Sequence, residues 1–118
     1  MRKIKFRAYN RIERCWEYSG SELHDFFYGI DDGQLDGETL GQYTGLKDKN
    51  DKEIYEGDIV ETINSVATMS GNQNFLIRAK VVYFASAFRF EFNGKAGLAH
   101  SSCEVIGNIY ENQELLTH

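Results

Sequence analysis

The chain has 118 residues, 42% of them hydrophobic, and 18 acidic residues outnumber 13 lysines and arginines to give a formal charge of -5. This composition predicts a single folded domain over residues 1–118 and excludes global disorder. The longest apolar runs span only a few residues and the first five residues are largely basic, so we expect no membrane contact, no secretion signal and a cytoplasmic location.

The first predicted element is a strand over residues 4–8, in which apolar and basic side chains alternate. The two predicted faces are Ile4, Phe6 and Ala8 on one side, and Lys3, Lys5 and Arg7 on the other. Together with Arg11, the basic face is a candidate contact surface for nucleic acid or a protein partner. The alternative is the solvent face of an ordinary edge strand, which the acidic net charge favours.

The elements that follow are mostly short strands. We expect a strand at residues 15–18, a short helix at 21–27, paired strands at 75–83 and 88–92, a strand at 105–109 and a helical turn at 112–116. Asn93-Gly94 predicts a two-residue hairpin turn. Residues 29–41 and 64–74 combine Gly, Asn, Asp and Ser, and predict mobile loops. The fold class is mainly β: a small barrel-like antiparallel β domain with one or two short helices.

One hydrophobic core is expected from the apolar faces of these strands. Its predicted members are Ile4, Phe6, Trp16, Tyr43, Leu46, Ile54, Ile59, Val81, Phe90, Val105 and Ile109.

The sequence has no motif that carries catalysis. Cys15 and Cys103 are predicted to be buried free thiols, and no histidine or cysteine spacing indicates a metal site. The acidic run at residues 48–53 lacks the oxygen ligands of a calcium loop, so a hairpin tip is the better interpretation. We therefore expect no enzymatic activity and no cofactor, and an enzyme working through Asp31, Asp32 and Asp36 is the least favoured hypothesis.

Three segments are more specific than any composition. Residues 42–60 contain Tyr-Thr-Gly-Leu and Glu-Gly-Asp-Ile-Val, residues 105–112 read Val-Ile-Gly-Asn-Ile-Tyr-Glu-Asn, and residues 4–8 read Ile-Lys-Phe-Arg-Ala. With these segments the chain resembles the YopX family of small phage and prophage proteins. The resemblance implies a barrel-like β fold, a phage or prophage origin in a bacterial host, and self-association, but no established activity. The motif residues are interpreted as structural: Tyr43, Gly45, Leu46, Tyr55, Glu56, Gly57, Asp58, Gly107 and Asn108.

Our leading hypothesis is a non-enzymatic accessory or interaction protein that forms a homo-oligomer and binds a protein partner of unknown identity. Residues 1–14 sum to +5 and residues 15–61 to -10, so neighbouring copies have complementary charge. The alternative is a small nucleic-acid-binding β-barrel that uses Lys3, Lys5, Arg7 and Arg11.

Overall fold

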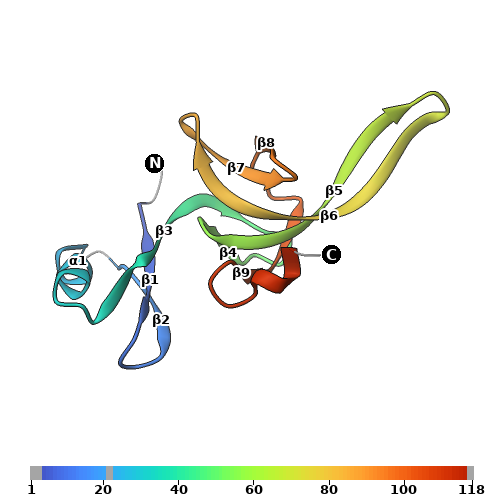
Figure 1. The fold of residues 1–118 in the computed structure, drawn as a ribbon. Coiled ribbons are helices and arrows are strands. Elements are labelled where there is room, and N and C mark those ends of the chain that lie inside the picture. The colour runs from blue at the N-terminus through green and yellow to red at the C-terminus, as the bar shows by residue number, and fades with distance from the viewer. Residues whose placement is uncertain (1–3, 21–22, 117–118) are drawn as a thin grey trace.

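The computed structural model describes residues 4–20 and 23–116, apart from the side chains of residues 66 and 67 (Figure 1). Strands dominate these residues, which confirms the predicted fold class. The elements in chain order are β1 (Phe6–Asn10), β2 (Cys15–Tyr18), α1 (Leu23–Asp31), β3 (Leu35–Lys47), β4 (Glu53–Tyr55), β5 (Asp58–Thr68), β6 (Gly71–Phe84), β7 (Ala87–Phe92), β8 (Lys95–Leu98), β9 (Cys103–Asn108) and the 3-10 helix η1 (Gln113–Leu116).

The strands form two antiparallel sheets. The first has the order β2-β1-β3-β4 and the second the order β8-β7-β6-β5-β9. Strand β3 pairs with β1 through residues 35–42 and with β4 through residues 43–47, so this long strand links the two halves of the molecule (Figure 1). The second sheet curls over itself as a half-barrel.

The predicted hairpin at Asn93-Gly94 is confirmed. Both residues have positive φ, 51° and 77°, and Phe92 pairs with Lys95 directly across the turn. The predicted pairing of residues 75–83 with 88–92 is also confirmed as β6 and β7. Their turn places Ala85 and Ser86 at positive φ, a conformation that neither residue type indicates in a sequence.

The expectation of one core is wrong, because the buried apolar residues form two clusters. The larger cluster lies against the second sheet: Ile54, Val60, Ala79, Val81, Phe90 and Cys103. The smaller cluster joins β1 and β3 to the helix: Ala8, Phe26 and Leu35. Most of the eleven predicted core residues are buried or half-buried, but Ile4 is 59% exposed. Helix α1 packs against the first sheet, and this contact forms a cluster of its own, separate from the main core.

Both predicted loops are largely regular structure. Residues 35–41 belong to β3, and residues 64–74 form most of a hairpin that extends away from the body (Figure 1). We call residues 63–76 the arm. The outer part of the arm is rich in Asn, Ser and Gly, so its sequence does not indicate strands. The strands form because the backbones of the two segments pair with each other.

The two cysteines have different environments, which corrects half of the expectation for them. Cys103 is buried, and burial raises the pKa of its thiol to about 11. Cys15 is exposed on β2, an edge strand of the first sheet. No helix in residues 4–20 or 23–116 is long and apolar enough to cross a membrane.

Candidate functional site at the junction of the sheets

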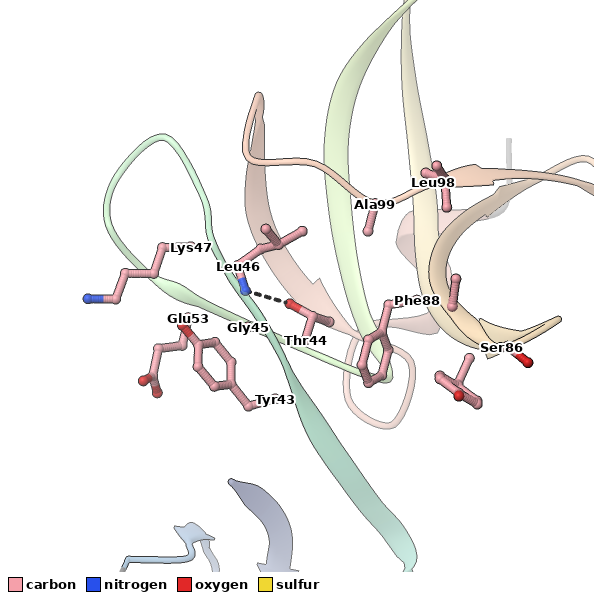
Figure 2. Close-up of a pocket in the computed structure, with 12 residues that line it drawn as sticks. Tyr43, Thr44, Gly45, Leu46, Lys47, Glu53, Ser86, Phe88, Leu98 and Ala99 are labelled. Carbon is pink, nitrogen blue, oxygen red and sulfur yellow. Dashed lines mark hydrogen bonds between the residues drawn. The ribbon is translucent and has the colours of Figure 1, made fainter. Parts of the chain in front are cut away.

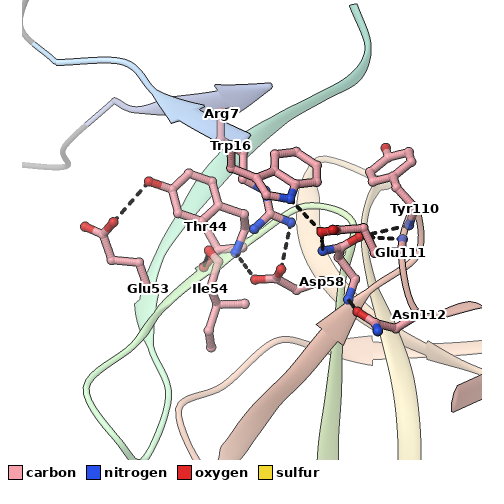
Figure 3. Close-up of polar contacts among 11 residues, drawn as sticks. Arg7, Trp16, Thr44, Glu53, Ile54, Asp58, Tyr110, Glu111 and Asn112 are labelled. Carbon is pink, nitrogen blue, oxygen red and sulfur yellow. Dashed lines mark hydrogen bonds and ion pairs between the residues drawn. The ribbon is translucent and has the colours of Figure 1, made fainter. Parts of the chain in front are cut away.

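A buried ion pair lies where the first sheet meets the start of β5 (Figure 3). Arg7 donates from Nη2 to Asp58 Oδ1 at 2.7 Å, and the two side chains are only 7% and 2% exposed. The second carboxylate oxygen of Asp58 accepts the Tyr55 N–H at 2.8 Å. Burial raises the pKa of the Asp58 carboxyl, while Arg7 and the Tyr55 N–H oppose that change. The pair therefore holds β1 and β5 together at a site that excludes water.

Two aromatic rings enclose the guanidinium of Arg7. Its central carbon lies 4.7 Å from the Trp16 ring centroid and 4.9 Å from that of Tyr55. Planar guanidinium groups stack well on aromatic rings, and this contact strengthens when water is excluded. Arg7 is thus committed to interactions within the protein.

The motif segment at residues 105–112 closes the junction from the C-terminal side. Glu111 Oε1 accepts the Trp16 Nε1–H at 2.7 Å and an Asn108 Nδ2–H at 2.9 Å (Figure 3). The hydrogen bonds from Asn108 and Trp16 hold the pKa of Glu111 below its usual value. Burial opposes this shift, and the charge of Arg7 adds to it. Asn108 Oδ1 accepts the N–H groups of Tyr110 and Glu111 and so fixes the turn after β9.

Glycine is required at two crowded positions around the junction. A Cβ on Gly41 would lie 2.5 Å from the carbonyl oxygen of Glu56, and one on Gly107 would lie 2.6 Å from Asn112 Oδ1. No larger residue fits at Gly41 without moving backbone. Each of these close approaches fixes the backbone within or beside one motif segment.

The remaining motif residues lie in β3, β4 and the turns beside them. Tyr43 is buried with its ring 5.5 Å from that of Tyr55, Gly45 and Gly57 have positive φ, and Leu46 packs against the larger core cluster. The Glu56 N–H donates to the carbonyl of Gln42. Each of these positions shapes a turn, a strand contact or the core.

Asp48 fixes the β3–β4 turn and ties it to β9. Its Oδ1 accepts the N–H groups of Asn50 and Lys52 at 2.8 and 2.9 Å, and its Oδ2 accepts the Val105 N–H at 2.8 Å. The hairpin-tip interpretation of residues 48–53 agrees with this geometry. Burial opposes ionisation of Asp48, but the three backbone donors and Lys52 outweigh it and lower its pKa below 3.8.

We expect Asp48 to make stability depend on pH in the acid range. Because its folded pKa is lowered, its contribution is fully present above the unfolded pKa of about 3.9 and is lost as pH falls through the lower folded value. Asp48→Asn places an amide donor against a backbone donor and lowers the free energy of unfolding by about 1–3 kcal/mol at pH 7. Urea denaturation between pH 7 and pH 2.5 should show a shallower acid loss in the variant.

Asp51→Asn is the matched control for this measurement, because its side chain is 84% exposed in the same turn and asparagine tolerates the φ of 66°. Its acid loss should match that of the parent. An Asp48→Asn protein with the parent's pH dependence would contradict this role of Asp48.

The basic residues of the N-terminal strand are not arranged as a row of exposed charges. The Lys5 ammonium group donates hydrogen bonds to both carboxylate oxygens of Glu53, at 2.9 and 3.0 Å. Arg7 forms the buried ion pair with Asp58. Arg11 is 59% exposed and lies 3.5 Å from Asp36, and Lys3 lies outside the described residues. The solvent-face interpretation of β1 is wrong for Arg7, because β1 is an inner strand between β2 and β3 and the Arg7 side chain is buried against Asp58.

The three aspartates of the enzyme hypothesis lie around the turn from α1 to β3: Asp31 is the last residue of α1, Asp32 follows it, and Asp36 lies in β3. Asp31 and Asp32 are exposed, Asp32 Oδ1 accepts the Gln34 N–H, and Asp36 Oδ1 accepts the Glu38 N–H. Two of the three thus stabilise local turns.

A pocket of about 700 Å³ lies between strands β3 and β4 on one side and strands β6, β7 and β8 on the other (Figure 2). Its walls are mainly apolar, with Tyr43, Leu46, Phe88 and Leu98 among them. Thr44 Oγ1 accepts the Leu46 N–H there and donates to the Ile54 carbonyl. Among residues 4–20 and 23–116, no group of three or more histidine, cysteine or acidic side chains is placed to hold a metal.

Sequence reasoning missed three polar organisers, namely Trp16 and Glu111 at the junction and Asp48 in the β3–β4 turn. The sequence indicates Trp16 only as a core residue and Asp48 only as part of an acidic turn. No local pattern pairs Trp16 with Glu111, which lies 95 residues away.

A family model described as YopX protein matches residues 3–117. The chain is similar to the crystal structure of protein EF1440 from Enterococcus faecalis, with a TM-score of 0.58, 23% sequence identity, and coverage of 98% of this chain and 99% of that chain. No curated protein sequence matches. The structural likeness supports the fold, and the family match spans the three motif segments that meet at the junction.

Proposed function

The chain belongs to the YopX family, and from its structure we propose that it is a non-enzymatic interaction protein that associates with further copies of itself through the arm. A phage or prophage origin and a place in the cytoplasm of the bacterial host are part of this proposal, and they rest on the family resemblance.

The observation that carries the proposal is the exposed surface of the arm (Figure 1). Strand β9 pairs with β5 only as far as Thr62, and β7 pairs with β6 only from Lys80. Within the described chain, the arm is therefore a two-stranded ribbon with open edges. Such ribbons are marginally stable alone in water, and open edges invite further pairing.

Exposed apolar side chains add to this tendency. Ile63 and Leu76 pair directly across the ribbon and are 61% and 67% exposed, and Phe75 on the other face is 48% exposed. A contact of two arms about a two-fold axis brings the same residues of each copy together. The arm is thus suited to an apolar, self-complementary contact.

The charge of the arm favours a protein over a nucleic acid. No lysine or arginine occurs between Glu61 and Arg78, whereas binding of nucleic acid depends on neutralising phosphates. Lys5 and Arg7 are already paired with Glu53 and Asp58. The nucleic-acid-binding alternative therefore rests on Arg11 and on Lys3.

Light scattering on the purified protein tests the proposal. We expect a mass that is a multiple of 13.5 kDa for the parent, and a shift towards 13.5 kDa for the double variant Ile63→Thr, Leu76→Thr, which keeps strand propensity but removes apolar surface. Ile12→Thr is the matched control, because Ile12 is 70% exposed in the β1–β2 turn, and it should keep the parent's mass. A parent that is monomeric at all concentrations refutes self-association. Salt-sensitive binding of DNA or RNA would favour the alternative.

A further inference from the structure

A second pocket, of about 550 Å³, lies on the outer side of the junction and combines aromatic rings with carboxylates. It is bordered by β1, β2, the first part of β3 and the turn after β9. Its chemically distinctive lining residues are Tyr9, Trp16, Asp36, Glu38, Tyr110 and Glu111.

The three rings meet at steep angles. The centroids of Tyr9 and Trp16 are 5.6 Å apart with an interplanar angle of 74°, and those of Trp16 and Tyr110 are 6.0 Å apart at 47°. Aromatic rings present partial negative charge on their faces and attract cations within about 6 Å. Rings of several orientations around one pocket are a feature of cation-binding sites.

The carboxylates have acceptor capacity beyond their internal bonds. Glu111 uses Oε1 for Trp16 and Asn108, and Asp36 uses Oδ1 for the Glu38 N–H and Arg11. The Glu38 side chain forms no hydrogen bond or ion pair with the part of the chain that the structure describes. Among the residues that the structure describes, Arg11 is the cation paired with these carboxylates, and the charge of Arg7 is met by Asp58. The three carboxylates therefore exceed the positive charge around them.

The protein itself shows what kind of cation these groups suit. Arg7 lies on the Trp16 ring with its guanidinium bonded to a carboxylate. A guanidinium offers five donors in one plane to carboxylate oxygens and stacks on rings, whereas an ammonium group is more strongly hydrated. We propose that this pocket binds a guanidinium group, presented as an arginine side chain of a polypeptide partner. The inference is independent of self-association through the arm, since the pocket and the arm share no residue.

The test uses the tryptophan of the pocket as reporter, because Trp16 is the one tryptophan in the sequence. Arginine blocked at both ends is titrated into the parent protein while Trp16 fluorescence and the amide NMR shifts of residues 109–111 are followed. We expect a saturable change. Blocked citrulline, which has the same shape without the charge, should bind at least tenfold more weakly, and blocked lysine also more weakly. Equal binding of citrulline or lysine would overturn the guanidinium assignment.

Variants test the residues involved. Glu38→Gln and Asp36→Asn should each weaken binding about threefold to tenfold, in line with loss of one charged acceptor. Arg11→Gln should strengthen binding, because it removes a competing cation from Asp36. Asp25→Asn is the control, since Asp25 is 85% exposed on α1, and should have no effect. Unchanged affinity in both carboxylate variants would overturn the site.

A blocked pentapeptide, Gly-Ser-Arg-Ser-Gly, distinguishes the two sources of a guanidinium. Tighter binding of the peptide than of methylguanidinium supports a polypeptide ligand. Equal affinities would overturn that part of the proposal. A monomeric parent that still binds the peptide would refute the arm proposal and leave this one standing.

Discussion

Replacing Arg7 by methionine should lower the free energy of unfolding by about 3–5 kcal/mol, because it breaks a buried ion pair. The change leaves the Asp58 carboxylate buried with its strongest partner gone. It also removes the guanidinium that lies between Trp16 and Tyr55. Urea denaturation at pH 7, followed by far-UV circular dichroism, measures the effect.

Two further variants distinguish the ion pair from a general effect of charge. Arg11→Met removes a 59% exposed arginine and should cost at most about 1 kcal/mol. Arg7→Met combined with Asp58→Leu removes both buried charges and should be more stable than the sum of the two single changes predicts. If Arg7→Met is as mild as Arg11→Met, the junction does not depend on this pair.

Phe90→Ala should lower the free energy of unfolding by about 3–5 kcal/mol, because it empties a large volume in the main core. Phe90 is 7% exposed and packs in the larger cluster, and its ring also contacts His100 at a centroid distance of 5.0 Å. Urea denaturation again provides the measurement.

Phe84→Ala is the matched control, because Phe84 is 67% exposed near the end of the same curled sheet. It should cost about 1 kcal/mol or less. A Phe90→Ala protein that unfolds at the same urea concentration as the parent would show that this strand face does not form the core.

The fold was predictable where a signal is local. Alternation identified β1, β6 and β7, and Asn93-Gly94 identified its hairpin because few residue pairs adopt positive φ at both positions. The arm was not predictable, since residues such as Asn72, Asn74 and Ser65 indicate a loop. They form strands because each has a backbone partner across the ribbon.

The candidate site was less predictable than the fold, because its contacts are distant in sequence. Arg7 alternates with apolar residues, and this pattern indicates a solvent face unless a partner is known. Its partner Asp58 lies 51 positions away in a segment interpreted as a turn. Asp58 does support that turn through the Tyr55 N–H, so the sequence interpretation identified one of its two roles.

The long separation of these contacts has a consequence for the order of folding. The hairpins β5–β6, β6–β7 and β7–β8 connect neighbouring segments, whereas Arg7 and Asp58 lie 51 positions apart. Strand β9 likewise pairs with β5 only after β6, β7 and β8, with Asn108 opposite Asp58. Contacts between distant segments carry a larger loop-closure cost and tend to form late. We therefore expect loss of the Arg7–Asp58 contact to raise the unfolding rate more than it lowers the folding rate, which stopped-flow measurement of both rates would show. The junction would then set mainly the unfolding rate, and with it the lifetime of the native state.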